Sequence, residues 1–170
     1  MPRTTRKLLP NEAEAYAALR QVMLAQEPFA FLASPEDDFA SNPAKVREHL
    51  GEEEAALFGA FVGPELVGAV GVLRARRVKA RHTIRAWGMF VLPAHRGAGA
   101  GRTLLGEAID YARRLPGAVR LGLSVSETAE PALRLYQSMG FEIWGTEPDA
   151  ISHGERRVAE HHLSFLLVRV

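Results

Sequence analysis

The stretch from Trp87 to Leu115 places the strongest constraint on how this chain folds. An apolar, β-favouring run, Trp87–Leu92, ends at Pro93, and the small residues Gly97–Gly101 follow a single arginine. Beyond them, apolar side chains recur at the spacing of one helical face, namely Leu104, Leu105, Ala108, Ile109, Ala112 and Leu115. The pattern predicts a strand, a tight turn and an amphipathic helix in direct succession.

The turn before this helix is suited to an anion. Bulky side chains are absent from Gly97–Gly101, so a ligand can approach the backbone closely. The first N–H groups of a helix lack internal partners, and the summed peptide dipoles give that end roughly half a positive charge. We therefore predict a phosphate-bearing ligand at this turn.

Two common phosphate-binding motifs fit poorly. A P-loop ends in Gly-Lys-Ser/Thr, whereas Gly101 is followed by Arg102 and Thr103. A dinucleotide fingerprint needs a third glycine where Arg102 or Leu104 stands, and it needs an acidic residue about twenty positions further on. That region is the non-acidic segment Arg120–Leu123. A glycine-rich turn that binds nothing is the remaining alternative.

The turn and its flanks resemble motif A of the GNAT superfamily of N-acetyltransferases. Arg96, Gly99 and Gly101 match its core, Arg/Gln-x-x-Gly-x-Gly/Ala, and a Val-x-Pro sequence precedes them. In that family the backbone amides of the turn hold the pyrophosphate of acetyl-CoA, and the preceding strand holds the pantetheine arm. The resemblance implies cofactor contacts from Phe90, Val91, Arg96, Gly97, Ala98, Gly99, Ala100, Gly101 and Arg102.

A second segment carries the same resemblance. The family often shows L-x-V-x-x-x-N-x-x-A-x-x-L-Y-x-x-x-G-F, which this chain matches at Leu123, Val125, Ala132, Leu135, Tyr136, Gly140 and Phe141. Ala129 stands in place of the asparagine, so the contact from that side chain is absent. The tyrosine of the Leu-Tyr pair is the usual proton donor of the family, so the resemblance implies that Tyr136 is catalytic.

The sequence does not identify a general base. An alkylammonium acceptor, with a pKa of about 10, must lose a proton before it attacks, yet no carboxylate lies between Arg81 and Arg96. The remaining candidates, acting directly or through water, are His82, Glu127, Glu142 and Glu160. The segment Glu160–His162 resembles an acidic and histidine-containing segment of some family members. Because adjacent strand residues face opposite sides, we expect the two histidines to be structural and no metal to be bound.

The rest of the chain predicts alternating strands and helices. We expect strands at 6–9, 57–62, 66–73, 119–125, 141–146 and 160–170, and further helices starting at Asn11, at Asn42 and at Ser126 or Thr128. Residues 26–41 and 151–157 are predicted loops. This order is similar to the GNAT fold, an α/β (α+β) architecture with a mixed, mostly antiparallel sheet of about seven strands and about four helices, splayed at the cofactor site.

The sequence leaves the roles of two segments open. Phe29, Phe31 and Phe39 lie near acidic residues 36–38, and they could line an amine-binding mouth or seal the core. The basic run 74–81 could be a solvated hairpin tip or could contact an anion such as a CoA phosphate. No aromatic residue alternates with these bases, so we predict no nucleic-acid binding.

Composition places the chain among globular proteins. With 170 residues and 47% hydrophobic residues, we expect one domain over residues 1–170. A net charge of +1 gives no general attraction to nucleic acid or to a membrane surface. The chain has no cysteine, and its first residues, Met1–Lys7, lack the apolar run of a signal peptide, so we expect a cytoplasmic protein.

These observations predict an acetyl-CoA-dependent N-acetyltransferase in which a primary amine attacks the thioester directly. The acceptor is not indicated, because fold and cofactor site do not fix the second substrate. An acyl-CoA-binding sensor is the main alternative, favoured by the missing base and by Ala129. A nucleotide-binding protein is a third. The apolar closing strand 162–168 would permit a homodimer if it lay at a sheet edge.

Overall fold

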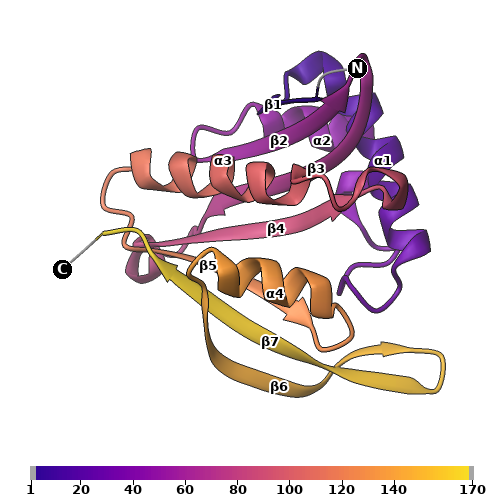
Figure 1. The fold of residues 1–170 in the computed structure, drawn as a ribbon. Helices are drawn as coiled ribbons and strands as arrows, with labels where there is room; N and C mark the ends of the chain where they lie inside the picture. The colour runs from indigo at the N-terminus through magenta and orange to yellow at the C-terminus, as the bar shows by residue number, and fades with distance from the viewer. Residues whose placement is uncertain (1–2, 169–170) are drawn as a thin grey trace.

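The computed structural model describes residues 3–168, which form a seven-stranded sheet with helices on both faces (Figure 1). The strands follow the order β1-β2-β3-β4-β5-β7-β6, in which β4 and β5 are parallel and all other neighbours are antiparallel. This confirms the predicted mixed, mostly antiparallel sheet. The elements are β1 (Arg3–Lys7), α1 (Ala13–Gln26), α2 (Pro43–Leu50), β2 (Ala55–Val62), β3 (Glu65–Arg74), β4 (Thr83–Val91), α3 (Ala100–Arg114), β5 (Arg120–Ser126), α4 (Glu130–Ser138), β6 (Glu142–His153) and β7 (Arg156–Leu166).

The sheet has a separate hydrophobic core on each face. Helices α3 and α4 cover the near face in Figure 1, and α1 and α2 pack against the other face of β2 and β3. Strand β3 contributes to both cores, with Val70 packed on the α3 side and Ala69 on the α1 side. Because both faces are covered, β2 and β3 are almost continuously apolar instead of alternating.

Of the three side-chain caps predicted at helix starts, the structure contains one. The side chain of Asn42 accepts a hydrogen bond from the Ala44 N–H (2.9 Å) and caps α2 as predicted. The prediction for α1 was wrong, because Asn11 lies inside a 3₁₀ turn, Pro10–Glu12, and α1 begins after it without a side-chain cap. The carboxylate of Glu12 instead accepts a hydrogen bond from the amide of Leu9 (2.8 Å) at the start of that turn. Helix α4 has no side-chain cap, since Ser126 and Thr128 hydrogen-bond to each other instead (2.9 Å).

We predict that Asn42→Ala lowers the free energy of unfolding by about 1 kcal/mol, because the Ala44 amide loses its partner. Urea denaturation of the two proteins measures the difference. Asn11→Ala is the matched control, since Asn11 is exposed and caps no helix. Equal losses in the two variants would contradict the capping role of Asn42.

The C-terminal third differs from the sequence prediction. Strands β6 and β7 form a long hairpin that turns at Gly154, so the predicted loop at 151–157 is wrong. Ile151 is buried and pairs with Val158, whereas Pro148 and Asp149 interrupt the apolar pattern that would have revealed the strand. Strand β7 lies between β5 and β6, so the edge pairing expected for a dimer through residues 162–168 has no basis.

The basic run 74–81 also divides into two parts. Arg74 is buried at the end of β3, where it pairs with Glu54 (2.8 Å) and donates to the carbonyl of Pro116 (2.7 Å). The prediction of a solvated tip therefore holds for exposed residues such as Arg76, Arg77 and Lys79, but not for Arg74.

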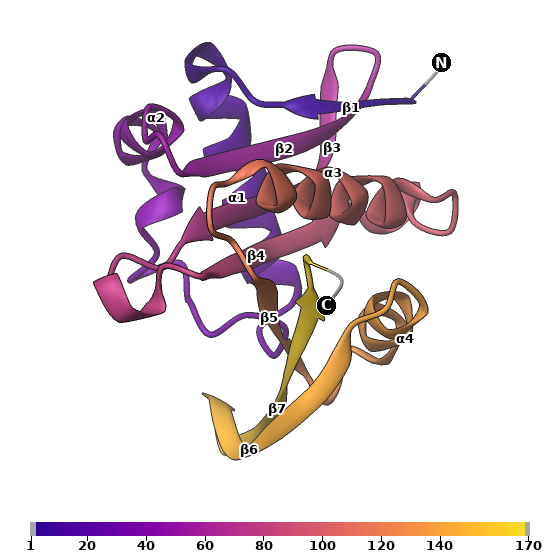
Figure 2. The same ribbon diagram turned by 90° about the vertical axis from the view of Figure 1, so that its left-hand side faces the viewer.

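The sheet opens between β4 and β5. Their parallel ladder contains only the pairs Thr83–Arg120, Ile84–Leu121 and Arg85–Gly122. Beyond it the strands diverge, and in the quarter-turn view of Figure 2 the part built from β5, β7 and β6 is set at a steep angle to β2–β4. The predicted splay is thus present. No helix within residues 3–168 has both the length and the apolar character needed to cross a membrane.

Candidate active site

A cavity of 580 Å³ lies where β4 and β5 separate. Its walls come from the end of β4, the turn before α3, the first two turns of α4 and the segment after α1. The cofactor-binding residues predicted from the sequence that line it are Phe90, Val91, Arg96, Gly97, Gly99, Ala100, Gly101 and Arg102. Ala98 is the exception; it is exposed beside the cavity, and its carbonyl accepts a hydrogen bond from Arg3 (2.6 Å).

The glycine turn leaves its backbone open to a ligand. Gly97 and Gly99 adopt left-handed φ values of +78° and +85°, and a Cβ on either residue would meet no atom within 4 Å. Gly99 is the N-cap of the fifteen-residue helix α3, so the free amides of that helix begin here. At Gly101 a Cβ would lie 3.1 Å from the side chain of Leu135, so this residue forms a closely packed floor. The observed cradle fits a diphosphate.

Two arginines frame the turn. Arg96 donates from Nε to the carbonyl of Val91 (2.8 Å) and from Nη2 to the carboxylate of Glu27 (2.9 Å). Its guanidinium also lies over the ring of Phe90, 5.4 Å from the centroid. Arg102 donates to the hydroxyl of Ser138 (2.7 Å). Arg96 thus fastens the turn to the end of β4 and to Glu27, the residue that follows α1. The side chains of Arg96 and Arg102 are both exposed beside the turn.

A second, smaller cavity of 80 Å³ adjoins the first in the gap between β4 and β5. It is lined on one side by Trp87, Gly88 and Met89 of β4, and on the other by residues 123–125 of β5. Gly88 has a φ of +59° and sits at a bulge where the register of β3 and β4 shifts. This cavity leads through the sheet towards the face covered by α1.

Tyr136 lies at the junction of the two cavities and lines both. Helix α4 buries the side chain to 5% exposure against Phe141. Burial raises the pKa of Tyr136 to about 12, because the charged phenolate would lose its hydration. The phenol therefore stays protonated at neutral pH and can act as a proton donor.

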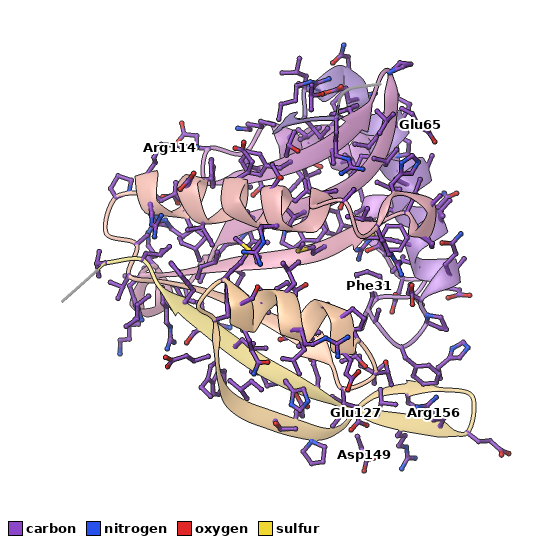
Figure 3. All side chains as sticks on the ribbon, in the orientation of Figure 1. Phe31, Glu65, Arg114, Glu127, Asp149 and Arg156 are labelled. Carbon is purple, nitrogen blue, oxygen red and sulfur yellow. The ribbon has the colours of Figure 1, made fainter. Side chains whose placement is uncertain are left out.

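The three phenylalanines of the segment after α1 have separate roles. Phe31 lines both cavities and lies at the open end of the sheet (Figure 3). Phe39 packs against Trp87, and Phe29 packs against His153 of the β6–β7 hairpin. Only Phe31 lies where an acceptor mouth could be, and that role stays a prediction.

None of the four base candidates, His82, Glu127, Glu142 and Glu160, lines either cavity. Glu127 instead accepts a hydrogen bond from the backbone of Ala159 (2.9 Å). Glu160 is half-buried, and burial raises the pKa of its carboxyl. As predicted, His161 and His162 point to opposite faces.

Sequence reasoning missed a cluster on the face of His162. Ligand-type atoms of Glu147, Glu160 and His162 lie within 4.8 Å of one another, and Ser124 contacts His162. Glu147 could not be found from the sequence, because the strand that carries it was predicted to end before it. That the reaction needs no metal stays a prediction.

The split sheet, the glycine turn and the buried phenol lie together around one cavity. A family model described as Acetyltransferase (GNAT) family matches residues 16–141. The chain therefore belongs to the GNAT family of acetyltransferases, as the resemblance of its sequence implied.

Curated relatives are similar over part of their length. A streptothricin acetyltransferase from Streptomyces lavendulae is 41% identical over 73 residues, which are 43% of this chain and 38% of that protein. The N-alpha-acetyltransferase RimI from Mycobacterium tuberculosis is 37% identical over 101 residues, 59% of this chain and 60% of that protein. Both matches span less than two thirds of the relative.

Solved structures are similar over nearly the whole chain. An N-acetyltransferase from Staphylococcus aureus has a TM-score of 0.86 at 16% identity, covering 99% of this chain and 100% of that one. The structure of YncA from Salmonella typhimurium with its cofactor acetyl-CoA has a TM-score of 0.84 at 21% identity, covering 100% of this chain and 96% of that one. At these identities the likeness establishes the fold.

Proposed function

We propose that the protein transfers an acetyl group from acetyl-CoA to a primary amine, which attacks the thioester directly. The observation that carries this proposal is the position of Tyr136, where the cavity of the glycine turn meets the gap through the sheet. One opening serves the cofactor and the other serves the acceptor. Family membership and a relative of the same fold with acetyl-CoA support the choice of cofactor.

Each part of the site has a task in this reaction. The amides of Gly97–Gly101 and the start of α3 hold the diphosphate, and the backbone of Phe90 and Val91 holds the pantetheine arm beside the open edge of β4. Acetyl-CoA supplies the activated acetyl group. Tyr136 gives a proton to the departing thiolate. The amine enters past Phe31 from the opposite face, so that donor and acceptor are aligned across the sheet.

A non-catalytic sensor of acyl-CoA is the second candidate. Ala129 lines both cavities where the family often has asparagine, and no carboxylate among the described residues lines the smaller one. A sensor would need the cofactor cradle but no route for a proton.

We predict that acetyl-CoA releases thiol when the protein is given a suitable primary amine. The panel should include short alkylamines, amino acids, an amine-bearing antibiotic and a peptide with a free N-terminus, because the relatives are named for antibiotic and N-terminal acetylation. Thiol release is followed with a chromogenic disulfide, and heat-denatured protein is the control. Tight binding of CoA in calorimetry without turnover on any amine would favour the sensor.

A further inference from the structure

A chain of three polar side chains runs from the smaller cavity to the surface. Ser124 of β5 lines the cavity, and its Oγ lies 2.9 Å from Nδ1 of His162 on β7. Nε2 of the same ring lies 3.3 Å from Oε2 of Glu147 on β6. The exposed fraction of the side chain rises along this path, from 21% for His162 to 60% for Glu147.

Strand pairing creates this arrangement. Ser124 is directly opposite His162 in the β5–β7 ladder, so the two side chains leave the sheet on the same face. In the β6–β7 ladder, Glu147 is opposite Glu160, and the register shift between Ile143 and Gly145 sets its position. Like charges directly opposite each other are unfavourable, and ligand-type atoms of both carboxylates and of His162 lie within 4.8 Å of one another.

The hydrogen-bonding geometry allows a proton to pass from Ser124 to the ring of His162. The Ser124 hydroxyl can donate to Nδ1 of His162 when Nε2 carries the proton and donates to Glu147. The Ser124 oxygen, on a residue that lines the cavity, can then also accept a hydrogen bond. The indole of Trp144 stacks on the imidazole, with centroids 5.3 Å apart, and holds the ring in this orientation.

Three ionisable side chains lie in the surroundings of His162. Two carboxylates face it, Glu147 from β6 and Glu160 from its own strand, and the guanidinium of Arg85 on β4 acts on the same cluster. Burial raises the pKa of Glu160, and the nearby His162 opposes that rise. With two acidic groups and one basic group nearby, the ring lies in a net negative environment.

We propose that Ser124 and His162 are the proton acceptor for the amine substrate, with Glu147 orienting the ring. The ammonium of the bound acceptor gives one proton to Oγ of Ser124, while Ser124 gives its own proton to Nδ1 of His162. The acceptor becomes a neutral amine with a free lone pair, and His162 becomes an imidazolium beside Glu147 and Glu160. The proton leaves later to solvent through the exposed Glu147. This proposal rests on the proposed acetyltransferase function.

The placement of the two proton-transfer groups supports this assignment. The side chains with oxygen or nitrogen that line the smaller cavity belong to Trp87, Ser124 and Tyr136. Tyr136 projects from α4 and remains protonated, so it acts as the acid. Ser124 projects from β5 on the other side of the cavity and is connected to an imidazole, so it acts as the base. Acid and base thus face the reacting atoms from separate elements.

The test compares acceptors that differ in basicity but hardly in shape. Ethylamine and its mono-, di- and trifluorinated forms become progressively weaker bases, so a smaller fraction of each needs deprotonation at neutral pH. We expect His162→Gln to lower kcat/KM about thirtyfold for ethylamine, since a positioned base contributes roughly 10²–10⁴ and water replaces part of it. For trifluoroethylamine the loss should be less than about threefold. Ser124→Ala should show the same trend.

The controls separate this role from a structural one. His161→Gln changes the neighbouring histidine, which bonds Thr146 (2.9 Å) on the opposite face, and should leave all four amines unaffected. Equal losses across the fluorinated series in His162→Gln would overturn the proposal, as would acetylation of Ser124 itself found by mass spectrometry. If the wild-type protein acetylates no amine, the proposed acetyltransferase function itself fails. If the wild-type protein acetylates amines and His162→Gln has the same kcat/KM for all four, only the proton-acceptor role of Ser124 and His162 is contradicted.

Discussion

Gly99→Glu is expected to weaken the binding of CoA at least about a hundredfold, equivalent to about 2.7 kcal/mol. Gly99 is the N-cap of α3 and lines the large cavity, where its missing side chain leaves free space. A glutamate there would fill the cradle and place a negative charge at the proposed diphosphate site. Isothermal titration with CoA measures the loss.

Gly117→Glu is a matched control for this variant. Gly117 follows the opposite end of α3, has a φ of +71° and is equally open, with no atom within 4 Å of a Cβ. It lines neither cavity. The two variants therefore carry the same backbone strain and the same added charge. Loss of CoA binding in both, or in neither, would show that the glycine turn is not the cofactor site.

Tyr136→Phe should reduce kcat by about two to three orders of magnitude while the Kd for CoA stays within about twofold. The substitution removes the hydroxyl at the junction of the cavities but keeps the ring that packs against Phe141. Steady-state measurement of thiol release with the best amine of the panel gives kcat. Tyr111→Phe is the control, because the Tyr111 hydroxyl bonds the carbonyl of Ala55 (3.1 Å) away from both cavities. An unchanged kcat in Tyr136→Phe would remove the proposed acid.

The raised pKa of Tyr136 adds a second measurable consequence. Because burial disfavours the phenolate, its pKa of about 12 keeps the acid protonated across the whole neutral range. No alkaline decline of kcat from this group is expected below roughly pH 11. The raised pKa also makes the free energy of unfolding depend on pH. The stabilising contribution of the neutral Tyr136 phenol is complete below the unfolded pKa of about 10 and is lost as pH rises towards 12. Tyr136→Phe should lack this alkaline loss in urea titrations.

The parts of the fold that sequence reasoning predicted depend on local patterns. The strand, turn and helix over residues 87–115 follow from apolar periodicity and small residues, and the α2 cap follows from Asn42 before Pro43. The β6–β7 hairpin was missed where Pro148 and Asp149 interrupt the strand pattern. The pairing of this hairpin depends on contacts with distant segments, and the β-propensity of its own residues says little about those contacts.

The same distinction holds within the site. The glycine turn and Tyr136 were predicted because each belongs to a motif within one short segment. Ser124 and Glu147 were not, because their proximity to His162 arises only when β5, β7 and β6 pair in one register. A single-residue slip would turn Ser124 to the other face. Such a cluster is a property of topology, and a sequence read segment by segment does not contain it.

The short ladder between β4 and β5 has a consequence for stability. It contains three residue pairs, and the large cavity beside it is lined by residues of both α3 and α4. A ligand bound in this cavity would contact elements on both sides of the opening. Because such a ligand binds the folded protein, its free energy of binding adds to the free energy of unfolding, so saturation with ligand stabilises the folded chain.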